Sequence, residues 1–168
     1  MANTQLLAGM ADIQVAKGAA LFTCLGLGSC IGFAAWDPKA KIGGIVHIML
    51  PEAFKDRLVE KPGKFATTGI PALVSEMVRN GAGERRLVCA YAGGAQVFKF
   101  GNGTEGRLDV GARNSKKVAD IVAEMRLNVI AKEVGGTNGR TMIMDTETGN
   151  IRIRTVNGAE KVLCNVNK

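Results

Sequence analysis

The chain has 168 residues, which suits one domain spanning 1–168 and leaves too little for two comfortable ones. No apolar run approaches the ~20 residues that span a bilayer, and the first residues lack a signal peptide's basic start, so we expect a cytoplasmic protein without membrane insertion. The net charge of +7 comes from scattered lysines and arginines, and with one Trp and one Tyr it favours a solvated surface or an acidic protein partner over nucleic acid.

The first half of the chain predicts short strands between glycine turns. β-branched and apolar residues predict strands over 12–16, 21–25, 30–36 and 42–50. Between the last two, Asp37-Pro38-Lys39-Ala40-Lys41 predicts a turn, because proline fixes φ and aspartate can accept a hydrogen bond from the following backbone. The two flanking strands therefore form an antiparallel hairpin.

The second half predicts two helices among further strands. Helical spacing of apolar residues predicts a helix over 66–80 with Gly81 as its C-cap, and a second helix over 115–127 with an N-cap signal at Asn114-Ser115. Arg113 and Asn114 are interpreted as capping residues of that second helix. Further strands are predicted over 86–92, 129–134, 141–145, 150–156 and 161–166.

This order of elements predicts the fold class. Strands, helix, strand, helix and strands give an α/β fold, a single-domain sandwich of a large mixed, mostly antiparallel sheet with two main helices packed on it.

Four cysteines lie far apart and form no C-x-x-C pair. They are Cys24, Cys30, Cys89 and Cys164. An even count allows two disulfides, but without an export signal we expect free thiols. The spacing and the presence of only one histidine argue against a zinc site, and we expect no metal and no cofactor.

Cys30 and His47 form the candidate catalytic pair. Cys30 ends a glycine-rich segment and His47 is the only histidine of the chain. A turn centred near Lys39 places the two residues near-opposite in an antiparallel pair, with a bulge able to shift the register by one. An imidazole can hold a thiol as thiolate, and the thiolate can attack an acyl or amide carbonyl.

The residues before Cys30 suit an oxyanion site. Gly26, Gly28 and Ser29 would let backbone N–H groups turn towards one point. Each member of the pair also has a simpler interpretation, with Cys30 as a small buried apolar residue and His47 as a core histidine with its hydrogen bonds satisfied. Their joint occurrence with a glycine turn and a hairpin spacing favours the catalytic interpretation.

Several motifs resemble one family. Leu25-Gly26-Leu27-Gly28-Ser29-Cys30, Asp37-Pro38 and His47-Ile48-Met49-Leu50-Pro51 resemble the bacterial chemoreceptor glutamine deamidases, the CheD family. The same holds for three later motifs: Lys61-Pro62-Gly63-Lys64-Phe65, Gly93-Gly94-Ala95-Gln96-Val97-Phe98 and Val110-Gly111-Ala112-Arg113-Asn114. The resemblance runs through nearly the whole chain in order.

The resemblance implies that the protein hydrolyses side-chain amides of particular chemoreceptor glutamines to glutamate and releases ammonia. It implies Cys30 as nucleophile and His47 as acid/base, in an α/β sandwich distantly similar to the catalytic domains of cytotoxic necrotizing toxins. It also implies two partners, the cytoplasmic helices of chemoreceptors and a CheC-type phosphatase of response regulators. Phe98 is a candidate for the partner surface, with a place in the core as its alternative, and 55–64 is a candidate substrate-facing loop.

One position departs from the family pattern. The family has threonine immediately before Leu-Gly-Leu-Gly-Ser-Cys as the third member of the catalytic set, whereas this chain has Cys24 there and Thr23 one residue earlier. Adjacent strand residues face opposite sides, so Thr23 does not simply substitute. Either Cys24 orients His47 poorly, or a backbone carbonyl orients it, or the enzyme is slow. Cys24 could also form a disulfide with Cys30 under oxidation.

These alternatives leave two hypotheses about function. The first is a cysteine amidohydrolase that acts on protein glutamine. The second is a weakly active or inactive CheD-like interaction module that binds receptors or a CheC-type phosphatase.

Overall fold

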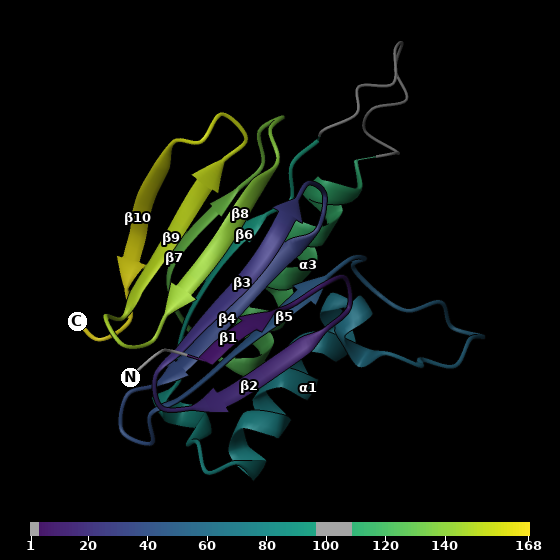
Figure 1. The fold of residues 1–168 in the computed structure, drawn as a ribbon. Coiled ribbons are helices and arrows are strands. Elements are labelled where there is room, and N and C mark those ends of the chain that lie inside the picture. The colour runs from purple at the N-terminus through teal and green to yellow at the C-terminus, as the bar shows by residue number, and fades with distance from the viewer. Residues whose placement is uncertain (1–3, 97–108) are drawn as a thin grey trace.

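Ten strands divide into two five-stranded sheets in the computed structural model, which describes residues 4–96 and 109–168 (Figure 1). The first sheet contains, in spatial order, β1 (Thr4–Leu7), β3 (Ala20–Leu27), β8 (Arg140–Asp145), β9 (Asn150–Thr155) and β10 (Glu160–Asn165). The second sheet contains, in spatial order, β2 (Ile13–Lys17), β5 (Ile42–Ile48), β4 (Ile31–Asp37), β6 (Val88–Gly93) and β7 (Asn128–Val134).

Two helices, α1 (Ala66–Arg79) and α3 (Val110–Met125), pack on one face of the second sheet, and the first sheet covers the other face (Figure 1). The 3-10 turns η1 (Pro62–Lys64) and η2 (Glu84–Arg86) flank α1. Within the described ranges, no helix combines the length and the apolar character needed to cross a bilayer.

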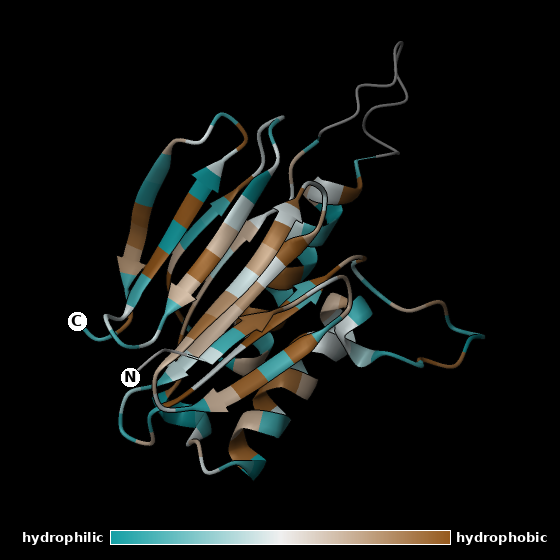
Figure 2. Cartoon of the chain, in the orientation of Figure 1, coloured by the Kyte–Doolittle hydropathy of each residue, from teal (hydrophilic) through white to brown (hydrophobic). Residues whose placement is uncertain are grey.

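The second sheet is the middle layer, and its central strands are buried on both faces. Every residue of β4 and β5 is buried, because one side of each strand contacts the helices and the other contacts the first sheet. The first sheet has one covered and one open face, and its strands alternate accordingly, as the apolar and polar bands along β9 in Figure 2 show.

The predicted α/β sandwich with two helices packed on it is confirmed. The predicted strands are present with end points within about two residues, as expected for element boundaries. The structure adds that the strands belong to two sheets, and that a strand missing from the prediction, β1, pairs in parallel with β3. β1 has four residues and is mostly exposed, so its apolar pattern is too short to predict a strand.

The predicted start of the second helix is wrong. Asp109, and not Asn114 or Ser115, is the N-cap, since its carboxylate accepts a hydrogen bond from the N–H of Ala112 at 2.8 Å. Asn114 lies inside α3 and is fully buried. At the end of α1 the C-cap is Asn80, and Gly81 follows it with φ at 113°.

A buried carboxylate fixes the turn between β4 and β5. Asp37 accepts hydrogen bonds from the N–H groups of Lys39 (2.9 Å) and Ala40 (3.1 Å), as the turn sequence predicts, and also from Gly83 (2.7 Å) and the guanidinium of Arg86 (2.8 Å). Burial alone would raise its pKa, but the Arg86 guanidinium and the three N–H groups outweigh it and hold the pKa well below its usual range.

Replacing Asp37 with Ala should lower the free energy of unfolding by about 2 kcal/mol at neutral pH, because the charge-assisted hydrogen bonds are lost. A carboxylate with a lowered folded-state pKa stabilises the fold above its unfolded pKa of about 3.9, and this stabilisation disappears as the pH falls through the folded pKa. The difference between parent and variant should therefore shrink in acid. Urea unfolding at pH 7 and pH 3 measures it.

The matched control is Asp120→Ala, which removes only an exposed pair with Lys116 on the same helix. It should change stability by less than about 0.5 kcal/mol. Equal losses in the two variants would contradict the assigned role of Asp37.

Candidate active site

Cys30 and His47 lie at the same end of the second sheet on neighbouring strands. Cys30 immediately precedes β4, and His47 lies near the end of β5, where it pairs with Gly32. Cys30 lies two residues beyond Gly32, so it is diagonal to His47 and not directly opposite, as the near-opposite register predicted from the turn at Lys39 would have placed it. Cys30 packs against the apolar layer between the two sheets, the side that Gly32 also faces.

The hydrogen bond of His47 fixes its tautomer. Its Nδ1 lies 3.0 Å from the carbonyl oxygen of Ala8, and because a carbonyl only accepts, Nδ1 carries the proton. The other nitrogen, Nε2, is then an acceptor, and it is buried without a hydrogen-bond partner in the described part of the chain. In the neutral imidazole, Nε2 is therefore the basic nitrogen, and a general base requires such a nitrogen.

The segment between β1 and β2 holds His47 by its backbone. The N–H of Ala11 donates to the His47 carbonyl at 2.9 Å, and the N–H of His47 donates to the Asp12 carbonyl at 3.1 Å. Ala8 is itself fixed, since its N–H donates to the carbonyl of Thr23 at 2.8 Å. The orienting group is therefore a backbone carbonyl, which the sequence left open as one alternative without a residue to assign to it.

Cys24 lies near the pair but does not orient the imidazole. Cys24 is fully buried on β3, and a Cβ built on Gly32 would lie 3.3 Å from its Cβ. His47 Nδ1 is already bonded to Ala8, and Nε2 has no partner within residues 4–96 and 109–168. Thr23 is half-buried and faces the other side of β3. Burial, followed by the nearby Cys30, raises the pKa of the Cys24 thiol far above its ordinary range.

Three consecutive carbonyl groups of the turn before β4 are anchored. The Gly28 carbonyl accepts from the N–H of Ala95 (2.7 Å), the Ser29 carbonyl from Nδ2 of Asn114 (2.8 Å) and the Cys30 carbonyl from the N–H of Gly94 (2.9 Å). In a trans peptide the N–H of the next residue points opposite to the carbonyl. The N–H groups of Ser29 and Cys30 therefore point away from these anchors.

Neither of these N–H groups has an acceptor among the residues that the structure describes. Two unpaired N–H groups beside a nucleophile are the arrangement that an oxyanion site needs. The N–H groups of Ser29 and Cys30 are therefore the candidate oxyanion donors, and Gly28 is the candidate turn residue. The sequence did not single out the Cys30 N–H.

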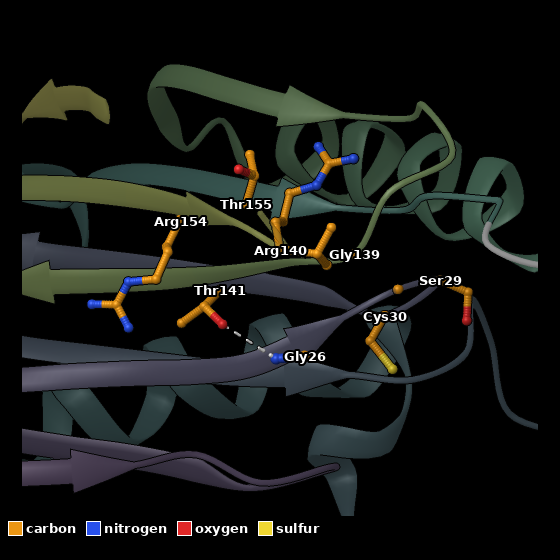
Figure 3. Close-up of a pocket in the computed structure, with 10 residues that line it drawn as sticks. Gly26, Ser29, Cys30, Gly139, Arg140, Thr141, Arg154 and Thr155 are labelled. Atoms are coloured by element: carbon orange, nitrogen blue, oxygen red, sulfur yellow. Dashed lines mark hydrogen bonds between the residues drawn. The ribbon is translucent and has the colours of Figure 1, made fainter. Parts of the chain in front are cut away.

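A cavity of about 470 Å³ opens beside Cys30 (Figure 3). The turn 28–30 forms one wall, and the beginning of β8 and the end of β9 form the others. Two arginines line it, neither of which the sequence singled out. Arg140 is buried, donates to the carbonyls of Glu133 and Asn138, and is turned away from Cys30. Arg154 is half-exposed, and its guanidinium pairs with the carboxylate of Glu160 at 3.2 Å.

The pKa of Cys30 is shifted in the direction opposite to the one that a thiolate–imidazolium pair would give. Burial raises the pKa of the Cys30 thiol, whereas an imidazolium partner would lower it. Since Nε2 of His47 has no partner in the described residues, the thiol and the imidazole form no hydrogen bond in this structure. Burial therefore disfavours the thiolate of Cys30.

The other sequence expectations have simple outcomes. All four cysteines are free thiols. Within 4–96 and 109–168, no three His, Cys, Asp or Glu side chains are grouped so that they could hold a metal ion. The partner-surface candidate Phe98 lies outside the described residues. The loop over 55–64 is mostly exposed, with Leu58 almost fully so.

The chain is similar to one protein family throughout its length. Residues 49–155 match the model of the family described as CheD chemotactic sensory transduction. A protein of Desulforamulus reducens is 44% identical over 96% of both chains, and one of Clostridium novyi is 42% identical over 93% of this chain and 96% of its own. A third, of Symbiobacterium thermophilum, is 39% identical over 92% and 94%. Each of the three is named a probable chemoreceptor glutamine deamidase CheD.

The raised thiol pKa predicts the pH dependence of alkylation. The rate of Cys30 modification by iodoacetamide should rise with pH and reach its midpoint above the ordinary thiol value of about 8.5, because only the thiolate reacts. Cys89 is fully buried with its pKa raised to about 12, so it should stay unmodified in the native protein and serves as the internal control. Peptide mass mapping measures both sites. A Cys30 midpoint below pH 7 would show a resting thiolate–imidazolium pair instead.

Proposed function

This chain belongs to the CheD family, and from that premise we propose that it hydrolyses side-chain amides of chemoreceptor glutamines with Cys30 as nucleophile and His47 as general base and acid. One observation carries the assignment of roles. The Ala8 carbonyl holds a proton of His47 on Nδ1, so that Nε2, which has no partner among the described residues, is available to accept a proton on the strand beside Cys30, diagonal to it.

In the first half of the reaction, Nε2 of His47 accepts the thiol proton of Cys30. The thiolate attacks the amide carbon of the glutamine, and the carbonyl oxygen becomes an oxyanion that accepts hydrogen bonds from the N–H groups of Ser29 and Cys30. When the tetrahedral intermediate collapses, the C–N bond breaks and the imidazolium donates its proton to the leaving nitrogen. Ammonia leaves, and a thioester joins Cys30 to the former glutamine side chain.

In the second half, water replaces the nitrogen. Nε2 of His47 accepts a proton from the water as its oxygen attacks the thioester carbon. The C–S bond then breaks, the imidazolium returns the proton to the Cys30 sulfur, and the product is glutamate. No cofactor takes part in either half.

The substrate and the setting follow from the same premise. The net charge of +7 suits a receptor segment rich in carboxylates. We propose that the substrate glutamines lie on the cytoplasmic helices of chemoreceptors and that the reaction takes place in the cytoplasm. We also propose a CheC-type phosphatase as the second partner. The whole chain acts as one deamidase domain, since both sheets contribute to the apolar layer beside the pair.

Incubation with a purified cytoplasmic fragment of a chemoreceptor tests the proposal. Site-specific conversion of glutamine to glutamate, followed by mass spectrometry, should occur with the wild-type protein and vanish in Cys30→Ala. His47→Ala should lower kcat by 10²-fold or more, as is typical for loss of a general base. Cys164→Ala removes a half-buried thiol outside the cavity and should leave the rate unchanged.

Binding of the receptor fragment without any conversion would contradict the enzymatic proposal. The chain would then be an interaction module of the CheD family, and Cys30→Ala would bind as the wild-type protein does.

A second prediction concerns the departure at Cys24. Cys24→Thr should change kcat by less than about threefold, because the Ala8 carbonyl already orients His47. Cys89→Thr, which buries the same hydroxyl in the layer between helices and sheet, controls for the effect on stability. A tenfold rise in kcat for Cys24→Thr alone would show that the 24 position, and not the carbonyl, limits the imidazole.

A further inference from the structure

We infer that Asn114 is a positioning residue for the deamidation, because it orients the peptide group that donates the Cys30 N–H to the oxyanion. The inference rests on the function proposed above. Asn114 lies in α3, contributes nothing to the cavity wall and does not touch the reacting atoms.

The side chain of Asn114 joins the two strands that carry the candidate pair. Its Nδ2 donates to the carbonyl of Ser29 at 2.8 Å and to the carbonyl of Met49 at 3.0 Å. Ser29 directly precedes Cys30, and Met49 lies two residues after His47. A single amide group therefore links the segment of the nucleophile to the segment of the base.

The bond to Ser29 sets the direction of the Cys30 N–H. The Ser29 carbonyl and the Cys30 N–H belong to one planar peptide group and point in opposite directions. Holding the carbonyl towards α3 holds the N–H away from α3, and the turn that carries this N–H lines the cavity. The N–H groups of Ala95 and Gly94 bond to the carbonyls of Gly28 and Cys30, and these bonds fix the orientation of the two adjacent peptide groups.

The environment leaves the amide one orientation. Both neighbours of Nδ2 are carbonyl oxygens, which only accept, so the NH2 group and not Oδ1 must face them. Asn114 is fully buried, and its Oδ1 has no hydrogen-bond partner within the described residues. An unsatisfied buried acceptor is unfavourable, and the two hydrogen bonds that Nδ2 donates offset this cost.

The turn of α3 that precedes Asn114 packs closely against the segment 94–95. A Cβ on Gly111 would lie 2.5 Å from the Ala95 carbonyl oxygen, so the first turn of α3 packs directly on the segment that anchors the other two carbonyls. Helix capping does not explain Asn114, because Asp109 caps α3. All three anchors thus form one unit with the beginning of the helix.

Two kinds of reaction at Cys30 separate positioning of the oxyanion donor from general support of the fold. Deamidation passes through a tetrahedral oxyanion, whereas alkylation by iodoacetamide is a displacement at carbon that forms none. In Asn114→Ala and in the isosteric Asn114→Asp, kcat for deamidation of the receptor fragment should fall by about 10–10²-fold. The alkylation rate of Cys30 and the KM should stay close to those of the wild-type protein.

Lys116→Ala is the matched control. It removes only an exposed ion pair with Asp120 on α3. It should leave both rates unchanged, and circular dichroism establishes that all three variants are folded at the assay temperature.

The remaining outcomes overturn the inference in distinguishable ways. Unchanged kcat in the Asn114 variants, or an equal fall in kcat and in alkylation, would show that Asn114 does not act on the oxyanion donor. Failure of both variants to fold would make it a residue of the fold alone. Absence of deamidation by the wild-type protein would overturn the proposed function, and this inference with it.

Discussion

The arrangement of the site depends on the anchoring of three consecutive carbonyls in the turn 28–30. The anchors come from the end of β6 and from α3, and they need close backbone contact. A Cβ on Gly93 would lie 2.1 Å from the Cys30 carbonyl oxygen, and Gly93 and Gly94 have φ values of 121° and 63°. Glycine is required at both positions for these reasons. Cys30, the proposed nucleophile, thus lies on a turn that α3 and the segment after β6 hold in place, and these anchors set the direction of its N–H.

His47, the proposed base, is a polar side chain held inside an apolar layer. His47 lies between the two sheets, where one nitrogen bonds to Ala8 and the other has no partner in the described residues. Leaving a buried polar atom unpaired is unfavourable, and native proteins retain few such atoms outside functional positions. The hydrogen bonds of Ala11 and Asp12 hold the backbone of His47, and the Ala8 carbonyl holds its ring.

The sequence predicts the parts of the site that local signals determine. Asp37-Pro38 and the alternating strands define the β4–β5 hairpin, and the hairpin brings Cys30 to His47. Ala8 and Asn114 could not be predicted as contacts of the pair, because they meet it across 39 and 65 or more positions of sequence. The predicted start of α3 is wrong because Asp109 and the pair Asn114-Ser115 are equally good N-cap residues. The stretch between them carries no apolar periodicity that would show it to be helical. Division into two sheets likewise depends on pairing between distant strands.

The buried thiol of Cys30 and the free groups around it fit one mechanism. Burial raises the thiol pKa, so that the resting residue is a poor nucleophile. The groups that would change this, Nε2 of His47 and the N–H groups of Ser29 and Cys30, have no partners in the described residues. An amide substrate supplies what each lacks, because its carbonyl oxygen accepts from the two N–H groups and its attack by sulfur drives the thiol proton to Nε2. In the proposed mechanism the thiolate of Cys30 and the imidazolium of His47 therefore form only when the substrate is present. The groups without partners in the free protein then stabilise the transition state more than they stabilise the free protein.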